Sequence, residues 1–232
     1  MQQDKVVIVT GAFGALGQSV ARTLAPQGAK LALLDAAPAV PEALKHEFRA
    51  HLVLSGVDLS QDEATGVAVS RVVSHFGHVD ALVNIAGGFT WETIETGSIA
   101  TWERMFAMNL KTALHACQAV LPHLIAKGAG RIVNIGAAGA SKAGAGMGAY
   151  AASKSGVLRL TEALSEETKD RGLTVNAILP GIIDTPTNRK DMPDADHTRW
   201  VAPEAIADVV SFLLSDAARA VTGAGIPVMG RL

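Results

Sequence analysis

Residues 10–17 read TGAFGALG, and they follow directly on the apolar run VVIV at residues 6–9. The run has the length and β-branched content of a buried strand, and residues 15–26 are compatible with a helix. Glycines at such a turn let a bound group approach the backbone closely, and the helix N-terminus stabilises a negative charge. The stretch therefore predicts a pyrophosphate site, with an ordinary tight turn as the simpler alternative. The residues expected to form it are Gly11, Phe13, Gly14, Ala15, Leu16 and Gly17.

Outward from this unit, short β-branched runs alternate with longer segments of helical composition. Strands are expected at residues 5–10, 30–35, 51–55, 81–84, 131–135 and 173–179, with a last short strand near 226–229. Helices are expected at residues 15–26, 61–76, 101–126, 150–170 and 203–215. This alternation predicts an α/β fold: a doubly wound parallel sheet, Rossmann-like, with helices on both faces. Residues 136–148 are rich in Gly and Ala and are expected to form a mobile loop.

Composition restricts the domain number and the class of partner. A chain of 232 residues with 49% hydrophobic content is expected to fold as one domain, residues 1–232. Its 20 basic and 22 acidic residues are evenly mixed, which predicts a small-molecule substrate and neither nucleic acid nor membrane as partner. Cys117 is the only cysteine, so no intrachain disulfide can form, and a cytoplasmic location is expected.

The second expected strand ends in Asp35, 18 residues beyond Gly17. A carboxylate at this point can accept hydrogen bonds from both hydroxyls of an adenosine ribose, although it could also cap the following turn. Ala36 and Ala37 supply no cation for a 2′-phosphate, so NAD(H) is expected to be preferred over NADP(H).

Polar side chains and small residues also follow the third and fourth strands. Asp58 is expected to bond the adenine amino group, with Leu59 beside it, and Asn84, Ala86 and Gly87 are expected to border the ribose. Each could equally be a strand terminator or a cap. Their order along the chain favours the cofactor site.

Tyr150 is the only tyrosine, and Lys154 lies four residues later, on the same face of a helix. A free phenol has a pKa of about 10, which is too high for efficient proton exchange near neutrality. A nearby ammonium and an oxidised nicotinamide ring would both favour the phenolate. The pair is therefore expected to act as a proton-transfer unit.

Taken together, these motifs resemble the short-chain dehydrogenases/reductases over nearly the whole chain. The resemblance implies a proton relay at Asn109, acid/base catalysis by Tyr150, ribose binding by Lys154 and a nicotinamide contact at Thr185. The motifs that carry it are Gly11 to Gly17, Asn84-x-Ala86-Gly87, Asn109 in a Met-Asn-Leu-Lys run, Tyr150-x-x-x-Lys154, and Pro180-Gly181 followed by Thr185-Pro186. The resemblance also implies cofactor contacts at Tyr150, Pro180, Gly181 and Ile183.

The chain departs from that family pattern where a serine normally stands, 13 residues before the tyrosine. Ala137 occupies the position and is a candidate substrate contact. Ser141, the nearest hydroxyl downstream, could reach the substrate from the mobile loop, although a loop-tip serine solvated by water is the favoured alternative. The usual middle glycine of the first motif is also replaced, by Ala15. The dihydropteridine reductase branch lacks the same serine, and it resembles this chain in Gly14-Ala15-Leu16-Gly17 and in the expected lid, residues 184–202. That resemblance implies a quinonoid pterin-like substrate as an alternative to a carbonyl/alcohol pair.

The remaining expectations concern the substrate pocket, the assembly and a rival function. Phe89, Trp91 and Met147 are expected to line an apolar pocket, although core packing is an alternative, and Trp200 is expected to close the lid. His75 and His78 lie three residues apart near the end of an expected helix, but no cluster of Cys, Asp or Glu completes a metal set, so a solvated helix is favoured and no metal is expected. The family resemblance implies a homodimer or homotetramer. The rival to an active enzyme is a catalytically silent dinucleotide-binding protein.

Overall fold

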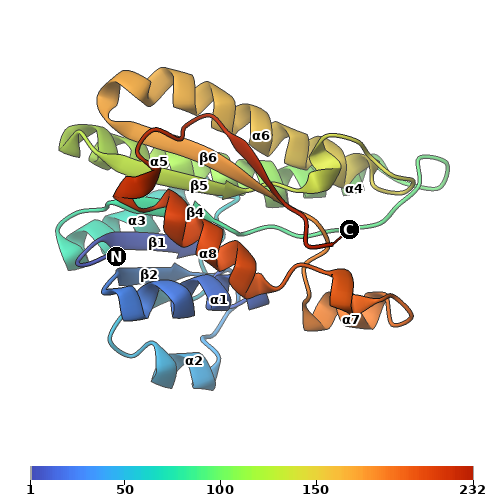
Figure 1. The fold of residues 1–232 in the computed structure, drawn as a ribbon, viewed down its shortest axis with the longest axis horizontal. Helices are drawn as coiled ribbons and strands as arrows, with labels where there is room; N and C mark the ends of the chain where they lie inside the picture. Colours follow the sequence, from blue (N-terminus) through green and yellow to red (C-terminus); the bar gives the residue numbers. More distant parts are fainter. Residues whose placement is uncertain (1, 232) are drawn as a thin grey trace.

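The computed structural model describes residues 2–231, which form a seven-stranded parallel sheet with helices on both faces (Figure 1). The strands are β1 Val6–Thr10, β2 Lys30–Leu34, β3 Leu52–Leu54, β4 Ala81–Asn84, β5 Gly130–Ile135, β6 Leu173–Pro180 and β7 Gly225–Val228. They lie in the order β3-β2-β1-β4-β5-β6-β7, and every neighbouring pair is parallel. The expected doubly wound α/β fold is confirmed, including the short last strand.

The helices are α1 Ala15–Leu24, α2 Glu42–Glu47, α3 Asp62–Phe76, α4 Ile99–Met105, α5 Thr112–Lys127, α6 Gly148–Thr168, α7 Pro186–Asp191 and α8 Pro203–Leu213. Most begin within two residues of the expected positions. The expectation missed α2, a single short helix whose six residues bury only Leu44. It also missed α7 inside the expected lid, where the short segment leaves no buried face to create a periodic pattern.

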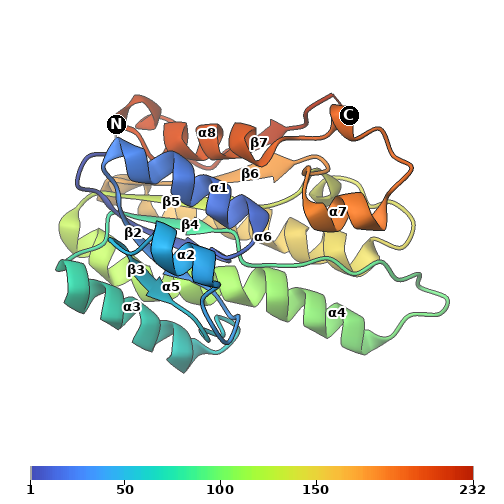
Figure 2. The ribbon, with the colours of Figure 1, turned by 90° about the horizontal axis from the view of Figure 1, so that it is seen from below.

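Alternate residues of the strands pack into two cores, one on each face of the sheet. In β1, Val7 and Val9 pack with α1 and α8, whereas Val6 and Ile8 pack with α3 and α5. Figure 2 shows these two helix layers on opposite sides of the sheet. Because both faces are covered, β1 carries the uninterrupted apolar run VVIV instead of an alternating pattern.

The helix expected over residues 101–126 is wrong as a single element. It is divided into α4 and α5 by a π-helical turn, Phe106–Lys111. The backbone N–H of Thr112 donates to the carbonyl of Ala107, five residues earlier, so the turn holds one extra residue. Asn109 lies within the turn and is buried.

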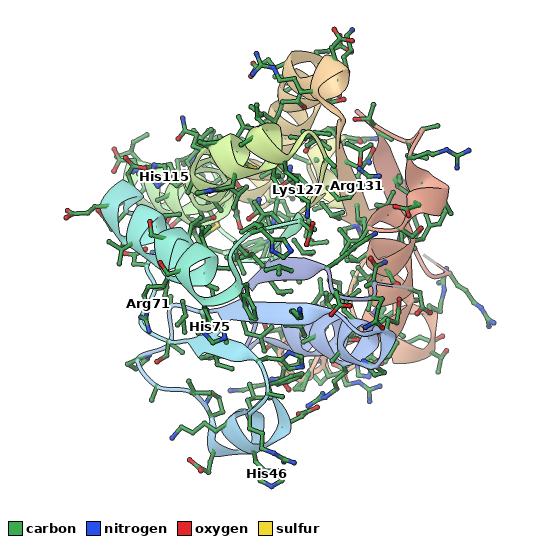
Figure 3. The ribbon with its side chains drawn as sticks, turned by 90° about the vertical axis from the view of Figure 1, so that its left-hand side faces the viewer. His46, Arg71, His75, His115, Lys127 and Arg131 are labelled. Carbon is green, nitrogen blue, oxygen red and sulfur yellow. The ribbon has the colours of Figure 1, made fainter. Side chains whose placement is uncertain are left out.

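Figure 3 views the amino ends of the strands, opposite the edge where ligands bind in folds of this kind. Lys127 and His78 both contact the carboxylate of Asp80, which also accepts a hydrogen bond of 2.7 Å from the backbone of Val6. His75 packs edge-on against Phe76. Within residues 2–231 no three metal-binding side chains gather, and no helix is long and apolar enough to cross a bilayer.

Candidate active site

A cleft of about 1380 Å³ runs along the carboxyl ends of the strands. It extends from the glycine turn after β1, past the ends of β2, β3 and β4, to the beginning of α7. Among the residues expected to bind cofactor, those that line it are Gly11, Phe13, Gly14, Ala15, Leu16, Gly17, Asp35, Asp58, Leu59, Ala86, Gly87 and Thr185.

Two glycines of the first turn have no room for a side chain. Gly11 has φ +62°, and a Cβ there would lie 2.8 Å from the backbone nitrogen of Ala86. A Cβ on Gly17 would lie 2.3 Å from the carbonyl oxygen of Gly11. The N-cap of α1, Gly14, supplies no side-chain acceptor, so the first N–H groups of the helix have no side-chain partner there. This cradle fits the pyrophosphate of a dinucleotide.

Asp35 lines the cleft just after β2 and also organises the local backbone. Its Oδ2 accepts a hydrogen bond from Phe13 N and its Oδ1 accepts one from Ala37 N, both 2.9 Å long. Asp35 therefore does cap the turn that follows β2, which was the alternative to a cofactor role. Each carboxylate oxygen has a further acceptor site, so the same side chain can still receive ribose hydroxyls.

Sequence reasoning missed a cation on the wall of this cleft, Arg22. Its guanidinium is held by both carboxylate oxygens of Glu47, at 2.7 and 2.9 Å, and by Gln18 at 3.2 Å. The spacing Gly14, Gln18, Arg22 places all three on one face of α1, which was the available signal. Because Glu47 neutralises Arg22, the charge of Asp35 is not cancelled from this side.

Asp58 lies exposed at the end of β3, and its Oδ1 accepts hydrogen bonds from the backbone and hydroxyl of Ser60. These bonds lower the pKa of the Asp58 carboxyl. The neighbouring carbonyl of Leu59 lies 3.1 Å from Nδ1 of His115, which ties this loop to α5.

Asn84 ends β4 with its side chain directed into the protein. Its Nδ2 donates to Asn134 Oδ1 at 2.9 Å and lies 3.4 Å from the sulfur of Cys117, whereas its Oδ1 has no hydrogen-bond partner among residues 2–231. The buried hydroxyl of Thr10 instead organises this end of β4, because it accepts from the N–H groups of Ile85 and Ala86. Thr10 was missed, although a threonine directly before the glycine turn was visible in the sequence.

Tyr150 and Lys154 lie one turn apart near the beginning of α6. Lys154 is buried, and its Nζ donates to the carbonyl of Ile135 at 2.8 Å. A Cβ on Gly87 would lie 3.4 Å from the same Nζ, so the ammonium group reaches the backbone that lines the cleft.

Asn109 connects this helix to the loop after β4. Its amide group donates to Ser153 Oγ at 3.0 Å and to the carbonyl of Gly88 at 3.1 Å, while its Oδ1 accepts from Gly88 N. Ser153 in turn donates to the backbone carbonyl of Tyr150. Residues from the π-helical turn, from α6 and from the β4 loop are thus held in one network.

Burial dominates the titration of the Tyr150–Lys154 pair. It raises the pKa of Tyr150 to about 12 and lowers that of Lys154 to about 8. Desolvation, which raises the pKa of Tyr150, therefore outweighs the lowering that was expected from the Lys154 ammonium. A phenolate at neutral pH would require a positive charge close to the Tyr150 hydroxyl that offsets this burial.

The candidate substrate residues lie in two groups. Ala137 is buried just after β5, and Ser141 is exposed at the end of a 3-10 turn, Ala138–Ala140. Phe89 packs against the ring of Tyr150, and the indole N–H of Trp91 donates to Ala145 O. Met147 immediately precedes α6.

The expected lid begins where β6 ends. Gly181, after Pro180, donates to the carbonyl of Val228 in β7, and Ile183 forms an isolated bridge with Val201. Thr185 caps α7 by accepting a hydrogen bond from Asn188 N. Trp200 is buried and packs on His197, so its ring anchors the segment.

Comparison with known proteins places this geometry in context. The family model described as short chain dehydrogenase matches residues 5–196. D-beta-hydroxybutyrate dehydrogenase of Rhizobium meliloti is 32% identical over 211 residues, which cover 89% of this chain and 82% of the relative. The 2-(R)-hydroxypropyl-CoM dehydrogenase of Xanthobacter autotrophicus is 30% identical, with 98% of each chain covered. The crystal structure of an NAD⁺-bound xylitol dehydrogenase superposes with a TM-score of 0.88 at 28% identity, covering 98% of both chains. These relatives are dehydrogenases of other kinds and do not show the dihydropteridine reductase branch.

Proposed function

This chain belongs to the short-chain dehydrogenase family, and from that premise we propose that it is an NAD(H)-dependent oxidoreductase. It would transfer a hydride between the nicotinamide and a small substrate, either a carbonyl/alcohol pair or a quinonoid pterin-like compound. One observation carries the proposal: Lys154, one turn from Tyr150, reaches Gly87 in the cleft that also contains the glycine cradle and Asp35.

When bound, NAD(H) supplies the hydride donor or acceptor. In reduction of a carbonyl, the Tyr150 hydroxyl donates its proton to the substrate oxygen as the carbonyl carbon receives the hydride. In oxidation of the alcohol, the phenolate removes the hydroxyl proton as the same carbon gives up the hydride. The Lys154 ammonium would hold the ribose hydroxyls and favour the phenolate. Asn109 would relay protons and keeps α6 in register with the loop that bears Gly88.

Asp35 is proposed to set the preference for NADH. In the variant Asp35→Ala, the ratio of the Kd values for NADPH and NADH should fall about tenfold, because a negative charge facing the 2′-phosphate is removed. Fluorescence titration measures both Kd values. Asp58→Ala is the matched control, since it removes a cleft carboxylate that would affect both cofactors alike. Tighter binding of NADPH than NADH by the native protein would refute the assignment.

Ala137 supports the pterin-like candidate as the second of the two substrate classes. A serine at this position in the family binds the oxygen of a carbonyl substrate, and a conjugated imine-like system has less need of that hydroxyl. The side chain of Ala137 is 6% exposed, so it offers a small apolar surface instead.

The substrate experiment compares NADH oxidation with quinonoid dihydropterin and with a panel of ketones and aldehydes, in the native protein and in Ala137→Ser. The added hydroxyl should raise kcat/KM for ketones about tenfold and leave the pterin nearly unchanged. If Ala137→Ser lowered kcat/KM for ketones, position 137 would not be the one that binds the carbonyl oxygen. Binding of NADH without oxidation by any member of the panel would support the silent dinucleotide-binding protein instead.

Three further proposals follow from the family and the surface. Residues 184–202 would act as a substrate lid hinged around α7 and anchored by Trp200. The exposed side chains Ile99 and Phe106 provide apolar surface for a homodimer or homotetramer, which light scattering can test. Cys117 is buried, and burial raises its thiol pKa to about 12, which suits an inert structural residue in a reducing compartment such as the cytoplasm.

A further inference from the structure

Two aromatic side chains stand exposed on the loop between β4 and α4. Phe89 is 54% exposed and Trp91 is 61% exposed, and together we call them the aromatic rim. Figure 1 shows this loop projecting beyond the beginning of α6, beside the loop that precedes that helix. Exposed rings close to a reactive side chain are surfaces on which a ligand can pack.

Hydrogen bonds hold the rim in place although it is exposed. The indole N–H of Trp91 donates to Ala145 O at 3.0 Å, and the next residue, Glu92, donates its backbone N–H to Gly146 O at 2.9 Å. Two consecutive residues of one loop are therefore bonded to two consecutive residues of the other. An indole fixed in this way loses little further freedom when a ligand packs on it.

Gly146 allows this close contact. Its φ of +72° is unfavourable for other residues, and a Cβ there would lie 2.2 Å from the indole carbon Cε2 of Trp91. The ring thus lies directly against the backbone, four residues before Tyr150 in the chain. The position of Trp91 is consequently coupled to the beginning of α6.

The other half of the rim contacts the reactive tyrosine itself. The rings of Phe89 and Tyr150 have centroids 5.0 Å apart and planes at 83°, an edge-to-face arrangement. Met147 continues the apolar surface, because a Cβ on Gly139 would lie 3.4 Å from its methyl carbon. The apolar side chains therefore extend from Trp91 to the segment that follows Ala137.

Two charged groups near the rim bond neutral local partners. Glu92 accepts a hydrogen bond from Ser98 N through its Oε2, and Arg104 donates to Thr90 Oγ1 at 3.3 Å. The side chain that contacts the ring of Tyr150 is the aromatic Phe89, so the surface next to Tyr150 favours a flat apolar group.

We infer that the aromatic rim selects substrates that carry an aryl or fused-ring group next to the reacting carbonyl. This inference rests on the proposed function and narrows its substrate class. A ring that packs on the rim would place the neighbouring carbonyl beside Tyr150, because Phe89 of the rim contacts the Tyr150 ring.

The test compares acetophenone with 2-octanone, two ketones of equal carbon number, as substrates with NADH. The native protein should prefer acetophenone, and Trp91→Ala and Phe89→Leu should each lower the ratio of the two kcat/KM values about tenfold. Trp91→Phe should retain most of the ratio. Phe212→Leu, which alters an exposed aromatic residue at the far end of α8, is the matched control and should leave it unchanged.

A binding measurement keeps the inference separate from the proposed activity. Calorimetric titration of the NAD⁺ complex with the same two ketones involves no turnover, and the Kd ratio should change in the variants as the kinetic ratio does. Tighter binding of acetophenone without any reduction would overturn the proposed function and leave the rim assignment standing. A ratio within twofold of the native value in both Trp91→Ala and Phe89→Leu would overturn the rim assignment, as would a loss of self-association in those variants with unchanged ketone binding.

Discussion

Replacement of Tyr150 by phenylalanine is expected to lower kcat about 10³-fold, the middle of the range for a lost general acid or base. The loss should be confined to the chemical step. Phenylalanine keeps the ring that packs edge-on against Phe89, so the beginning of α6 and the cleft should retain their shape. The Kd for NADH, measured by fluorescence titration, should therefore change less than about twofold.

The control for this variant is Ser155→Ala, which removes a hydroxyl from the same helix that bonds only the carbonyl of Ala140. The kcat of Ser155→Ala should be close to that of the native protein. Turnover unaffected by Tyr150→Phe would exclude the proton-transfer role, whereas an equal loss in both variants would mean that the defect is structural.

The second large effect is expected from Lys154→Met, which should lower kcat about 10²-fold or more and at the same time stabilise the fold. Burial lowers the pKa of Lys154 to about 8 from an ordinary value of 10.5, a shift worth about 3 kcal/mol. Loss of the hydrogen bond to Ile135 O offsets about 1 kcal/mol of this. The net gain at pH 7, about 2 kcal/mol, should raise Tm of the NADH-free protein by about 4–8 °C.

The stability gained in Lys154→Met should decrease as the pH rises. Between pH 8 and 10.5 the unfolded chain keeps the Lys154 proton and the folded chain does not, so native stability rises with pH across this window. Below pH 8 the folded protein bears the full penalty of a buried ammonium. The advantage of Lys154→Met should therefore be largest below pH 8 and disappear near pH 10.5.

Urea unfolding at several pH values measures this dependence. Lys45→Met, on the exposed face of α2, is the matched control, because its ammonium is exposed and bonds only Glu42. A stability difference between Lys154→Met and the native protein that is constant with pH would show that burial of charge is not its cause. A destabilised Lys154→Met with native-like activity would contradict both the structural and the catalytic assignment.

Much of the fold could be predicted because the central strands and the long helices are local patterns. The run VVIV of β1 is apolar on both faces, and a strand buried between two helix layers requires that composition. The glycine turn after β1 could also be predicted from the sequence. Gly11 and Gly17 have no space for a Cβ, so the turn requires glycine at these two positions. The position of Asp35 in the same cleft could be predicted as well, because the carboxyl ends of parallel strands meet at one edge of the sheet.

The π-helical turn at residues 106–111 could not be predicted in the same way. Residues 99–127 are mostly helix-forming, the one proline, Pro122, lies well beyond the turn, and one extra residue in a turn leaves no mark on composition. The amide of Asn109 bonds Gly88 and Ser153, which are distant in the chain, and such contacts help to hold the turn. Asn84 shows the same limit, since its contacts with Asn134 and Cys117 come from β5 and α5.

By itself, the sequence determined the alternation of strands with the longer helical segments, the glycine turn, and the spacing of Tyr150 and Lys154, because each depends on residues close together in the chain. The tertiary structure decided how deeply that pair is buried. Burial raises the pKa of the Tyr150 phenol, whereas the sequence led us to expect that the Lys154 ammonium would lower it. The tertiary structure also brought Trp91 against Gly146 and Phe89 against Tyr150. These contacts join loops that follow different strands, and only the packing of the whole sheet brings those loops together.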